Sequence, residues 1–421
     1  MRMSRYFKAS KILTAFILFT LCFGILDFVI FATNKTVLRV VELFDRKRVL
    51  NEEALRHVQS YDVILSAYMN SGSTYTGKIL GFRKDAFYFY EPLWRLTLWG
   101  YYKSNFTVCS TRTSTCREVS KDDINKNKPI VGRSNKGTLD FTLLHDDDII
   151  NKTITPVQIA QRIIRHVFQC CLLQVRNLIQ PEVTENAKFS GPSWNIYRYC
   201  LLRNKPFEYC LELLQSSNCQ EAKHKISKVL RLSLGALGNL LRDIPRLKGI
   251  HLFRDPRAVI HSRLETHGYP LERTKIHSGI KNNAKALCNK MASDLEEGKR
   301  LKKMFPNRFR FIHYEDIYTR DYALIELHTF LGMTINNDII YNARARVSNR
   351  GSRRDLSARS ERIRNNAFWW RRYLSWDIVK LVDAECSFLY SELGYPFIFD
   401  EHSLQYYNDT LLVHNLKFSF T

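Results

Sequence analysis

Hydrophobic and polar positions along the chain alternate between short strand-like segments and longer helix-like ones. The strand-like segments are apolar and rich in β-branched or aromatic residues, and they lie at residues 61–66, 87–90, 247–253 and 309–313. Most of the intervals between them carry helical signals. Strands that alternate with helices predict an α/β fold with a mainly parallel central sheet flanked by helices.

Several intervals have recognisable helix signals. Residues 159–179 are amphipathic, and Asp255 followed by Pro256 is typical of a helix start. Gly394 follows the apolar periodicity of residues 376–393 and predicts a helix end there. The segments expected to be helical are 75–82, 159–179, 225–241, the segment from Asp255 onward, and 376–393. Residues 103–154 are polar and are expected to form an irregular insertion.

An apolar segment of 21 residues, 12–32, is long enough to span a bilayer, and Asp27 is its only charge. All the charged residues before this segment are basic. The N-terminus is therefore expected to stay in the cytoplasm and the rest of the chain to face a lumen. A cleaved signal peptide is the alternative, but the segment is longer than a usual signal h-region and lacks a clear A-x-A site. The predicted organisation is a cytoplasmic tail (1–11), a transmembrane signal anchor (12–32), a stem (33–60) and a lumenal domain (61–421).

Sequons and cysteines agree with exposure to a secretory lumen. N-glycosylation sequons begin at Asn34, Asn105, Asn151 and Asn408. The ten cysteines suit an oxidising compartment. Without Cys22 of the anchor they are an odd number, so at least one is free or pairs with another chain. Cys109 and Cys116 bracket a short polar loop and are the expected intrachain pair, and no Cys/His spacing suggests zinc.

The formal net charge of +23 predicts an anionic partner. A secretory lumen excludes nucleic acid, so acidic glycans and anionic nucleotides are the expected partners. Arginines are dense between residues 344 and 372, where they could hold a nucleotide phosphate or an anionic polysaccharide. The oligomeric state does not follow from the sequence.

A polar turn stands between the first expected strand and the helix that follows it, an arrangement that makes an anion site. Free N–H groups at a helix N-terminus point at the ligand, and the helix dipole favours negative charge. Gly72 lets the backbone approach closely, and Ser71, Ser73 and Thr74 supply hydroxyl donors. An ordinary strand–turn–helix junction is the alternative.

The same turn has a second interpretation as a nucleoside-triphosphate loop. Residues 72–79 fit G-x-x-x-x-G-K-[ST] except at the last position, where Ile79 replaces the hydroxyl that holds magnesium. A lumenal kinase or nucleotidase that uses Gly72–Lys78 would lack that magnesium contact. A donor whose leaving phosphate is held by protein groups alone would not need that magnesium contact.

A second anion site is expected where the third predicted strand ends. Arg254 stands at the strand end, where its planar guanidinium can bind a phosphate with two hydrogen bonds. Ser262 lies two turns into the following helix and could donate to the same phosphate. The alternative roles are a salt bridge for Arg254 and a bond to its own helix for Ser262.

This segment resembles the 3′-phosphate-binding motif of sulfotransferases, in which an Arg and a Ser stand eight positions apart. The form Arg254-Asp-Pro-Arg-Ala-Val with Ser262-Arg263 is similar to that of Golgi carbohydrate sulfotransferases of the galactose/N-acetylgalactosamine/N-acetylglucosamine 6-O group. Residues 71–75 (SGSTY) resemble the 5′-phosphosulfate loop of that group. Further resemblances follow in order along the chain at 87–94 (FYFYEPLW), 313–316 (HYED), 357–360 (SARS), 370–372 (WRR) and 393–395 (LGY).

The resemblance implies a P-loop-like sulfotransferase fold in a single-pass Golgi membrane protein whose catalytic domain is lumenal. It implies transfer of a sulfuryl group from 3′-phosphoadenosine-5′-phosphosulfate (PAPS), without a metal, to a sugar hydroxyl of a glycan or glycosaminoglycan, at a 6-O position. The donor-binding residues that it implies are Asn70, Ser71, Gly72, Ser73, Thr74, Tyr75, Arg254, Ser262, Arg359 and Ser360.

A general base at the acceptor hydroxyl should speed the transfer, by roughly 10²–10⁴-fold. Glu91 is the candidate, because it ends the strand beside the first loop and related sulfotransferases use a carboxylate in this role. The alternatives are Glu315, Asp316, His251 and His313.

The sequence departs from the family pattern at Asn70, where the family usually has Arg and cytosolic relatives have Lys. An Asn can donate a hydrogen bond but has no charge to stabilise the leaving oxygen. A catalytically weak protein that binds glycan and nucleotide is therefore an alternative to an active transferase. The acceptor sugar does not follow from the sequence.

Overall fold

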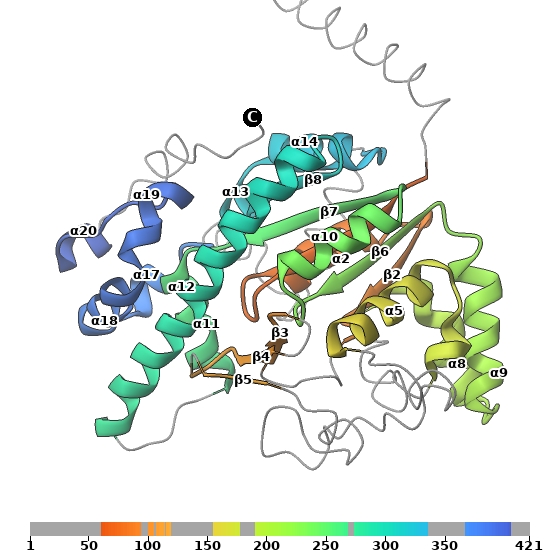
Figure 1. Ribbon diagram of the computed structural model, residues 1–421, viewed down its shortest axis with the longest axis horizontal. Coiled ribbons are helices and arrows are strands. Elements are labelled where there is room, and N and C mark those ends of the chain that lie inside the picture. Colours follow the sequence, from red (N-terminus) through yellow and green to blue (C-terminus); the bar gives the residue numbers. More distant parts are fainter. Residues whose placement is uncertain are drawn as a thin grey trace, which may run out of the picture. The chain divides into compact units, whose positions relative to one another are not determined.

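The computed structural model describes residues 60–93, 100–104, 107–113, 115–118, 155–176, 190–267, 273–335 and 367–405 (Figure 1). The chain divides by its contacts into two units, Met1–Gln59 and Ser60–Thr421, and every described residue belongs to the second. The predicted tail and anchor, the stem up to Gln59, the four sequon asparagines, Arg359 and Ser360 lie outside the described residues. None of the helices in the described ranges is long and apolar enough to cross a membrane.

A five-stranded parallel sheet has the strand order β2-β6-β1-β7-β8. Its strands are β1 (Asp62–Ala67), β2 (Ala86–Tyr90), β6 (His224–Val229), β7 (Leu247–Phe253) and β8 (Phe309–His313). The four strands expected from the sequence are all present, and the predicted α/β class with a mainly parallel sheet is confirmed. Parallel strands bring their carboxyl ends to one edge, and β1 in the middle has a neighbour on either side there.

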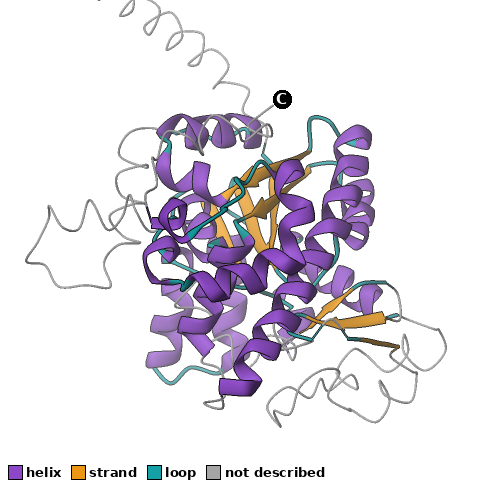
Figure 2. Cartoon of the chain, turned by 90° about the vertical axis from the view of Figure 1, so that its left-hand side faces the viewer, coloured by secondary structure: helices purple, strands orange, loops and turns teal. Residues whose placement is uncertain are grey.

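Helices pack on both faces of this sheet (Figure 2). Side chains of a strand alternate between its faces. Ile64 accordingly joins an apolar cluster with residues of several helices, and its neighbours Val63 and Leu65 join a second cluster with residues of other helices. The first cluster includes residues of α5 (Pro156–Phe168), α10 (Leu234–Asp243) and α12 (Arg273–Met304), and the second includes residues of α2 (Ser73–Gly81) and α14 (Asp321–Leu331).

The remaining elements lie around this core. The other described helices are α8 (Asn195–Leu202), α9 (Phe207–Leu214), α11 (Pro256–His267), α13 (Tyr314–Thr319), α17 (Trp370–Tyr373), α18 (Trp376–Cys386), α19 (Tyr390–Leu393) and α20 (Glu401–Gln405). Four short helical segments are η3 (Leu172–Val175), η4 (Pro192–Trp194), η5 (Gln215–Cys219) and η6 (Ser387–Leu389). A second sheet, antiparallel, contains β3 (Gly100–Tyr102), β4 (Thr107–Ser110) and β5 (Cys116–Glu118).

The prediction of a helix over residues 225–241 is wrong in its first half. Strand β6 occupies residues 224–229, and α10 begins only at Leu234. Two lysines interrupt the apolar pattern of β6, so periodicity did not reveal the strand. The sheet accommodates them because Lys225 is attracted to Asp62 and Lys228 contacts Glu91.

Three other helix and loop predictions needed correction. The expected helix 159–179 ends at Phe168, because Cys170 has a left-handed φ of 55° that turns the chain into η3. The insertion 103–154 is not wholly irregular, since it contains β4 and β5. Residues 376–393 form α18, η6 and α19 rather than one helix, and the predicted stop at Gly394 is confirmed by its φ of 75°.

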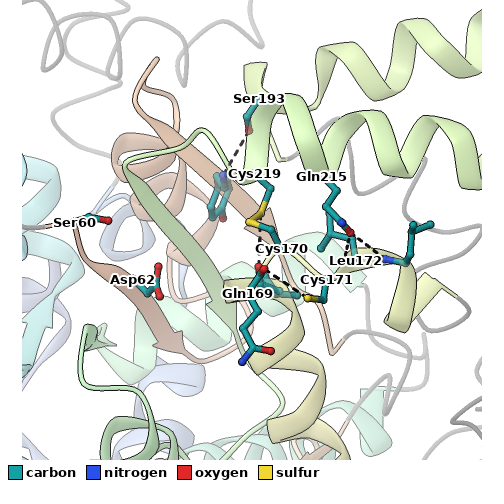
Figure 3. The surroundings of a disulfide bond; sticks show 12 residues. Ser60, Asp62, Gln169, Cys170, Cys171, Leu172, Ser193, Gln215 and Cys219 are labelled. Atoms are coloured by element: carbon teal, nitrogen blue, oxygen red, sulfur yellow. Dashed lines mark hydrogen bonds between the residues drawn. A yellow bond between two sulfur atoms is a disulfide. The ribbon is translucent and has the colours of Figure 1, made fainter.

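Four disulfides are present in the described residues. The expected Cys109–Cys116 bond is confirmed, and the others are Cys170–Cys219, Cys200–Cys210 and Cys288–Cys386. The odd count left at least one thiol outside the intrachain pairs, and Cys171 is that free thiol in the described part of the chain (Figure 3).

Candidate active site

The first predicted anion segment forms a tight loop, residues 68–72 (loop 1), between β1 and α2. The Ser71 backbone N–H and hydroxyl both donate to the Tyr68 carbonyl, at 3.3 and 2.8 Å. Gly72 has a φ of 84° and lies under the Tyr314 ring, where a Cβ would come within 2.1 Å of a ring carbon. Only glycine fits at this position, because a side chain would clash with the ring. Helix α2 begins at the next residue, Ser73. Its first N–H groups therefore face the carboxyl edge of the sheet.

Asn70 joins this loop to α11, the helix of the second predicted segment. Its Nδ2 donates to Thr266 Oγ1 at 3.1 Å and to both the carbonyl and hydroxyl oxygens of Ser262 at 3.4 Å. Its φ of 66° lies in the left-handed region that Asn tolerates better than most residues. Because the Ser262 hydroxyl accepts from Asn70, its own hydrogen can be donated to a ligand.

Arg254 closes the connection between the two segments. Its Nη1 donates to the Asn70 carbonyl at 3.1 Å, and its guanidinium lies 4.6 Å from the centre of the Tyr314 ring. The residue is 8% exposed, and its buried Nε has no hydrogen-bond partner among the described residues. The structure thus brings Asn70, Arg254 and Ser262 together.

On the other side of loop 1, two cations surround the predicted general base. Lys228 Nζ lies 2.8 Å from one oxygen of Glu91, and Arg231 Nη2 lies 3.4 Å from the other. Lys228 also donates to Thr74 Oγ1 at 3.0 Å. Arg231 is 2% exposed, and its buried Nε and Nη1 find no partner in the described part of the chain.

Glu91 is a constrained and electrostatically coupled carboxylate. Its φ of 44° is left-handed, which is a strained conformation for a residue with a Cβ. Burial alone would raise the pKa of Glu91, but the attraction of Lys228 and Arg231 outweighs it and lowers the pKa. A carboxylate held in this way is ionised at neutral pH and is a weaker base than a free one.

The four alternative bases have partners within the fold. His251 contacts Ser66 and Tyr68 by its two ring nitrogens, and burial lowers its pKa to about 3. Burial likewise lowers the pKa of His313 to about 4, and its ring contacts the Leu393 carbonyl. Burial raises the pKa of Asp316 to about 6, and its carboxylate faces Arg320.

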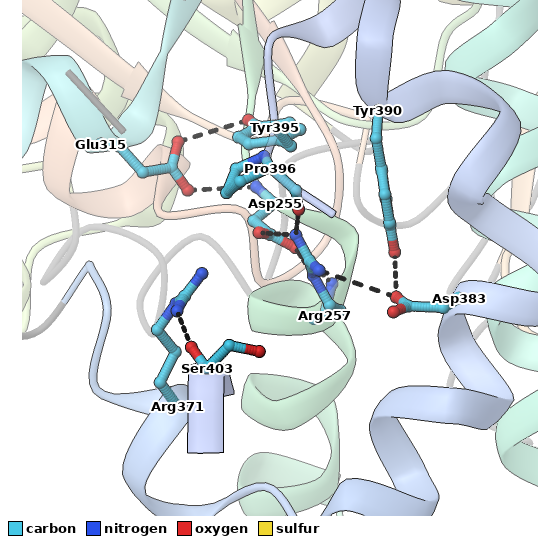
Figure 4. A network of polar contacts seen from close by, with 9 residues as sticks. All are labelled: Asp255, Arg257, Glu315, Arg371, Asp383, Tyr390, Tyr395, Pro396 and Ser403. Carbon is cyan, nitrogen blue, oxygen red and sulfur yellow. Dashed lines mark hydrogen bonds and ion pairs between the residues drawn. The ribbon is translucent and has the colours of Figure 1, made fainter. Parts of the chain in front are cut away.

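The fourth, Glu315, belongs to a buried polar network that supports Arg254 (Figure 4). Glu315 accepts from the Asp255 N–H at 3.0 Å and from the Tyr395 hydroxyl at 3.3 Å. Asp255 in turn accepts two hydrogen bonds from the Arg257 guanidinium, at 2.9 and 2.8 Å. Arg257 is fully buried and also donates to the Pro396 carbonyl at 3.0 Å. The residue after Arg254 is thereby fixed to α13 and, through Tyr395 and Arg257, to the C-terminal segment.

The remaining predicted donor residues lie at the start of α2. Ser73 is its first residue, and Thr74 is bonded to Lys228. The Tyr75 ring lies 4.9 Å from that of Tyr318 and 6.0 Å from that of Tyr314. Lys78, by contrast, is in the last turn of α2, with its ammonium 5.7 Å from the Phe82 ring. It is about 7 Å along the helix from Ser73, so the Walker-like register does not bring it to the helix N-terminus.

Sequence reasoning missed Lys228 and Arg231. The available signal was the β-branched pattern of Ile226 and Val229 around the lysine, which was assigned to a helix. Within the described ranges, no group of three or more His, Cys, Asp or Glu side chains is placed to hold a metal ion.

Curated relatives of this chain are named carbohydrate sulfotransferases. Carbohydrate sulfotransferase 1 of Danio rerio is 30% identical over 205 residues, which cover 44% of this chain and 47% of that protein. Carbohydrate sulfotransferase 4 of Mus musculus is 25% identical over 365 residues, covering 82% and 83% of the two chains. The chain thus spans about half the length of the carbohydrate sulfotransferase 1 relatives that it matches. The resemblance found in the motifs is confirmed by these names, and no family model matches the chain.

Solved structures similar to this chain are also sulfotransferases. Mouse sulfotransferase SULT7A1 complexed with PAP is 11% identical and aligns over 79% of this chain and 88% of that one, with a TM-score of 0.33. The sulfotransferase domain from the curacin biosynthetic pathway is 14% identical over 81% and 99% of the two chains, with a TM-score of 0.37.

Proposed function

We propose that this protein is a carbohydrate sulfotransferase that transfers a sulfuryl group from PAPS to a hydroxyl of a glycan. The observation that carries the proposal is a pair of buried guanidinium groups, Arg231 and Arg254, on the two sides of loop 1. Nε and Nη1 of Arg231 and Nε of Arg254 are buried and have no hydrogen-bond partner among the described residues. Buried polar groups without a partner are rare in proteins, so these donors are expected to serve an anionic ligand.

The donor would lie across β1 with its two phosphate groups on opposite sides. Arg254 and the Ser262 hydroxyl would hold the 3′-phosphate, because Asn70 leaves the hydrogen of that hydroxyl free to donate. The first turn of α2 and the hydroxyls of Ser73 and Thr74 would hold the 5′-phosphate. The sulfuryl end would then face β6 and β2, where Lys228 and Glu91 stand.

In the transfer itself, the bond between sulfur and the bridging phosphate oxygen breaks and a bond from sulfur to the sugar oxygen forms. The bridging oxygen leaves with the electron pair, and the hydroxyl proton passes to Glu91. Lys228 would supply the positive charge that Asn70 lacks, because its ammonium already lies between Thr74 and Glu91. As Lys228 is drawn to the leaving phosphate, its hold on Glu91 weakens and the carboxylate becomes a stronger base.

The compartment, the anchor and the acceptor position are also part of the proposal. Anchoring through residues 12–32 and a lumenal Golgi location are supported by the apolar segment with its basic flank and by the named relatives. The four disulfides suit an oxidising lumen. A 6-O acceptor position rests on the motif resemblance.

The test is transfer of labelled sulfate from PAPS by the purified full-length chain to a panel of desulfated glycans, together with calorimetric binding of the product nucleotide, 3′-phosphoadenosine-5′-phosphate (PAP). Arg254→Ala is expected to weaken PAP binding by roughly 10–100-fold, since it removes a charged hydrogen-bond donor. Arg246→Ala is the matched control. Arg246 is bonded to Asp62 at the opposite end of β1, so PAP binding should not change.

Each outcome has a distinct meaning. Label transfer by the wild-type chain with weak PAP binding by Arg254→Ala supports the whole proposal. PAP binding without transfer would reduce the protein to a nucleotide-binding relative. Equal PAP affinities for wild type and Arg254→Ala would contradict the proposed binding of the 3′-phosphate by Arg254.

A further inference from the structure

The small antiparallel sheet β3-β4-β5 is attached to the carboxyl edge of the central sheet through the segment that follows β6. The Tyr102 N–H of β3 donates to the Arg231 carbonyl at 3.0 Å, and the Ser233 N–H donates to the Tyr102 carbonyl at 3.0 Å. Arg231 is also the residue whose side chain contacts Glu91. This sheet therefore starts beside the proposed place of sulfuryl transfer (Figure 1).

A second attachment joins the far end of the sheet to loop 1. Thr111 follows β4, and its carbonyl accepts from Arg263 Nη1 at 3.2 Å. The same guanidinium donates to the Met69 carbonyl of loop 1 at 3.3 Å and to Asn283 Oδ1 of α12 at 2.5 Å. Arg263 is 6% exposed, so one buried guanidinium fixes the turn after β4, loop 1 and α12 together.

The turn after β4 is rigid in itself. We define the disulfide-closed turn as Ser110, Thr111, Arg112, Thr113 and Thr115, which lie between Cys109 and Cys116. The two cysteines are opposite each other in the register of β4 and β5 and form a disulfide. The Ser110 hydroxyl accepts from the N–H groups of Arg112 and Thr113, at 3.1 and 3.2 Å. The Ser110 N–H bonds the Thr115 carbonyl at 2.8 Å.

A small pocket lies between this turn and the central sheet. Its lining comes from loop 1 (Tyr68 and Met69), the turn (Thr111), the residue after β6 (Leu230) and two buried cations, Arg263 and Lys290. The turn thus borders a hollow that opens beside the loop expected to hold the 5′-phosphosulfate. Thr113 and Thr115 of the turn are exposed, and threonine hydroxyls suit hydrogen bonds to sugar hydroxyls.

We propose that the β3-β4-β5 sheet is the wall against which the acceptor glycan binds, and that its disulfide-closed turn sets the position of the sugar relative to the transferred sulfuryl group. The inference rests on the proposed function and deepens it. Arg254 and Ser262 place the 3′-phosphate side of the donor at β7 and α11, so the acceptor must enter from the β6 and β2 side. The sheet contacts Arg231 at that side through Tyr102, and its disulfide-closed turn contacts Met69 of loop 1 through Thr111.

The test removes the cross-link and changes no residue of the proposed donor site. In Cys109→Ser/Cys116→Ser, the KM for a desulfated glycan acceptor is expected to rise roughly ten-fold, because a loosened wall misplaces the sugar. The KM for PAPS should stay unchanged. Cys200→Ser/Cys210→Ser is the matched control. That disulfide joins α8 to α9 across a similarly short separation of 10 residues, against 7 for Cys109–Cys116, and its loss should alter neither KM.

A second variant covers the case in which the cysteine pair is needed for folding. Thr113→Gly loosens the turn at an exposed position, removes the hydroxyl contact with Thr115, keeps the Thr111 carbonyl that Arg263 binds and changes no residue of the donor site. The acceptor KM should rise in the same direction by a smaller factor, and thermal unfolding should match the wild type. An unchanged acceptor KM in a folded variant, or a parallel change of both KM values, would contradict the proposal that this sheet positions the acceptor.

Binding without turnover separates this inference from the proposed function. Desulfated glycan fragments are titrated into the full-length chain saturated with PAP. A wild-type chain that binds the fragments but transfers no sulfate contradicts the proposed activity, while weaker binding by Thr113→Gly still supports the proposed acceptor wall. A wild-type chain that binds no fragment would contradict the proposal that the acceptor binds against this sheet, whatever its PAP affinity.

Discussion

Lys228 links the proposed base to the loop that is expected to hold the phosphosulfate. Its ammonium contacts Glu91 and Thr74 and lies 4.1 Å from the centre of the Tyr90 ring. A cation in this place can stabilise charge on a leaving phosphate and tune the basicity of Glu91 at the same time. The lost charge at Asn70 is therefore not a sign of inactivity by itself.

Lys228→Met is expected to lower kcat by about 10²–10³-fold, which is the usual effect of removing one transition-state donor. Because Lys228 lowers the pKa of Glu91, its removal should also move the acid limb of the kcat/KM profile to higher pH. Steady-state kinetics across pH measure both effects. Lys225→Met, on the same strand but at the amino half of β6, is the control. A variant with wild-type kcat would show that the cation has no role in transfer.

Asn70 combines a backbone role and a side-chain role that two substitutions can separate. Asn70→Gly keeps the left-handed backbone accessible and removes the amide, whereas Asn70→Ala loses both. Both variants should bind PAP several-fold more weakly, because Ser262 and Thr266 lose a donor worth about 1 kcal/mol. Asn70→Ala alone should lose a further ~1 kcal/mol of unfolding free energy. Calorimetry and urea denaturation measure the two effects, and equal stability of the variants would contradict the backbone role.

The joint between β7 and α11 depends on side chains from other elements. Asp255 is held by Glu315 of α13 and by Arg257 of its own helix, whose guanidinium lies 4.4 Å from the centre of the Tyr390 ring and 5.1 Å from that of Trp370. The C-terminal segment thus supports Arg254 without containing it. A change in this joint should therefore alter donor affinity and stability together.

Glu315 makes this joint dependent on pH. Burial raises the pKa of Glu315 from 4.5 to about 7. Between these pH values the folded state keeps a proton that the unfolded state has released, so the free energy of unfolding falls as pH rises through this window. The contribution is fully present below pH 4.5, and about 3 kcal/mol is lost by pH 7.

Glu315→Gln should remove this contribution. Between about pH 5 and about pH 7.5, the free energy of unfolding measured by urea denaturation should fall less in the variant than in the wild type, by about 2 kcal/mol. Glu401→Gln, which changes an exposed carboxyl of α20, should behave like the wild type. A Glu315→Gln profile parallel to the wild-type profile would show that this carboxyl does not titrate as described.

The disulfides connect the described unit over very different lengths of chain. Cys288–Cys386 joins α12 to α18 across 98 residues, whereas Cys200–Cys210 closes only 10. The conformational entropy that a cross-link removes from the unfolded chain increases slowly with the length of the enclosed loop. The long cross-link is therefore expected to stabilise the fold more than the short one.

Urea denaturation under non-reducing conditions can compare the two. Cys288→Ala/Cys386→Ala should lose about 5 kcal/mol of unfolding free energy and Cys200→Ala/Cys210→Ala about 3 kcal/mol. All four side chains are buried, at 6% exposure or less, so the cavities left behind are similar. Equal losses would mean that the constraint on the unfolded chain is not what these bonds contribute.

Local patterns in the sequence were sufficient for the α/β class, four of the five central strands, the loop before α2, the start of α11 and the Cys109–Cys116 bond. Each depends on residues that are near one another in the chain, where periodicity, capping residues and turn residues have direct physical meaning. Arg254 and Ser262 were also found in this way, since both belong to one strand–helix junction.

Only the tertiary structure decided which distant residues meet. Asn70 and Ser262 are 192 residues apart, and Lys228 and Thr74 are 154 apart. The order β2-β6-β1-β7-β8 brings them to one edge, and strand order is not written in local periodicity. Strand β6 was missed because its lysines are buried by partners from other strands. The sequence by itself thus determined the two segments that are proposed to bind anions and the resemblance to sulfotransferases, while the parallel sheet decided that Lys228, Arg231 and Glu91 lie together beside the first of them.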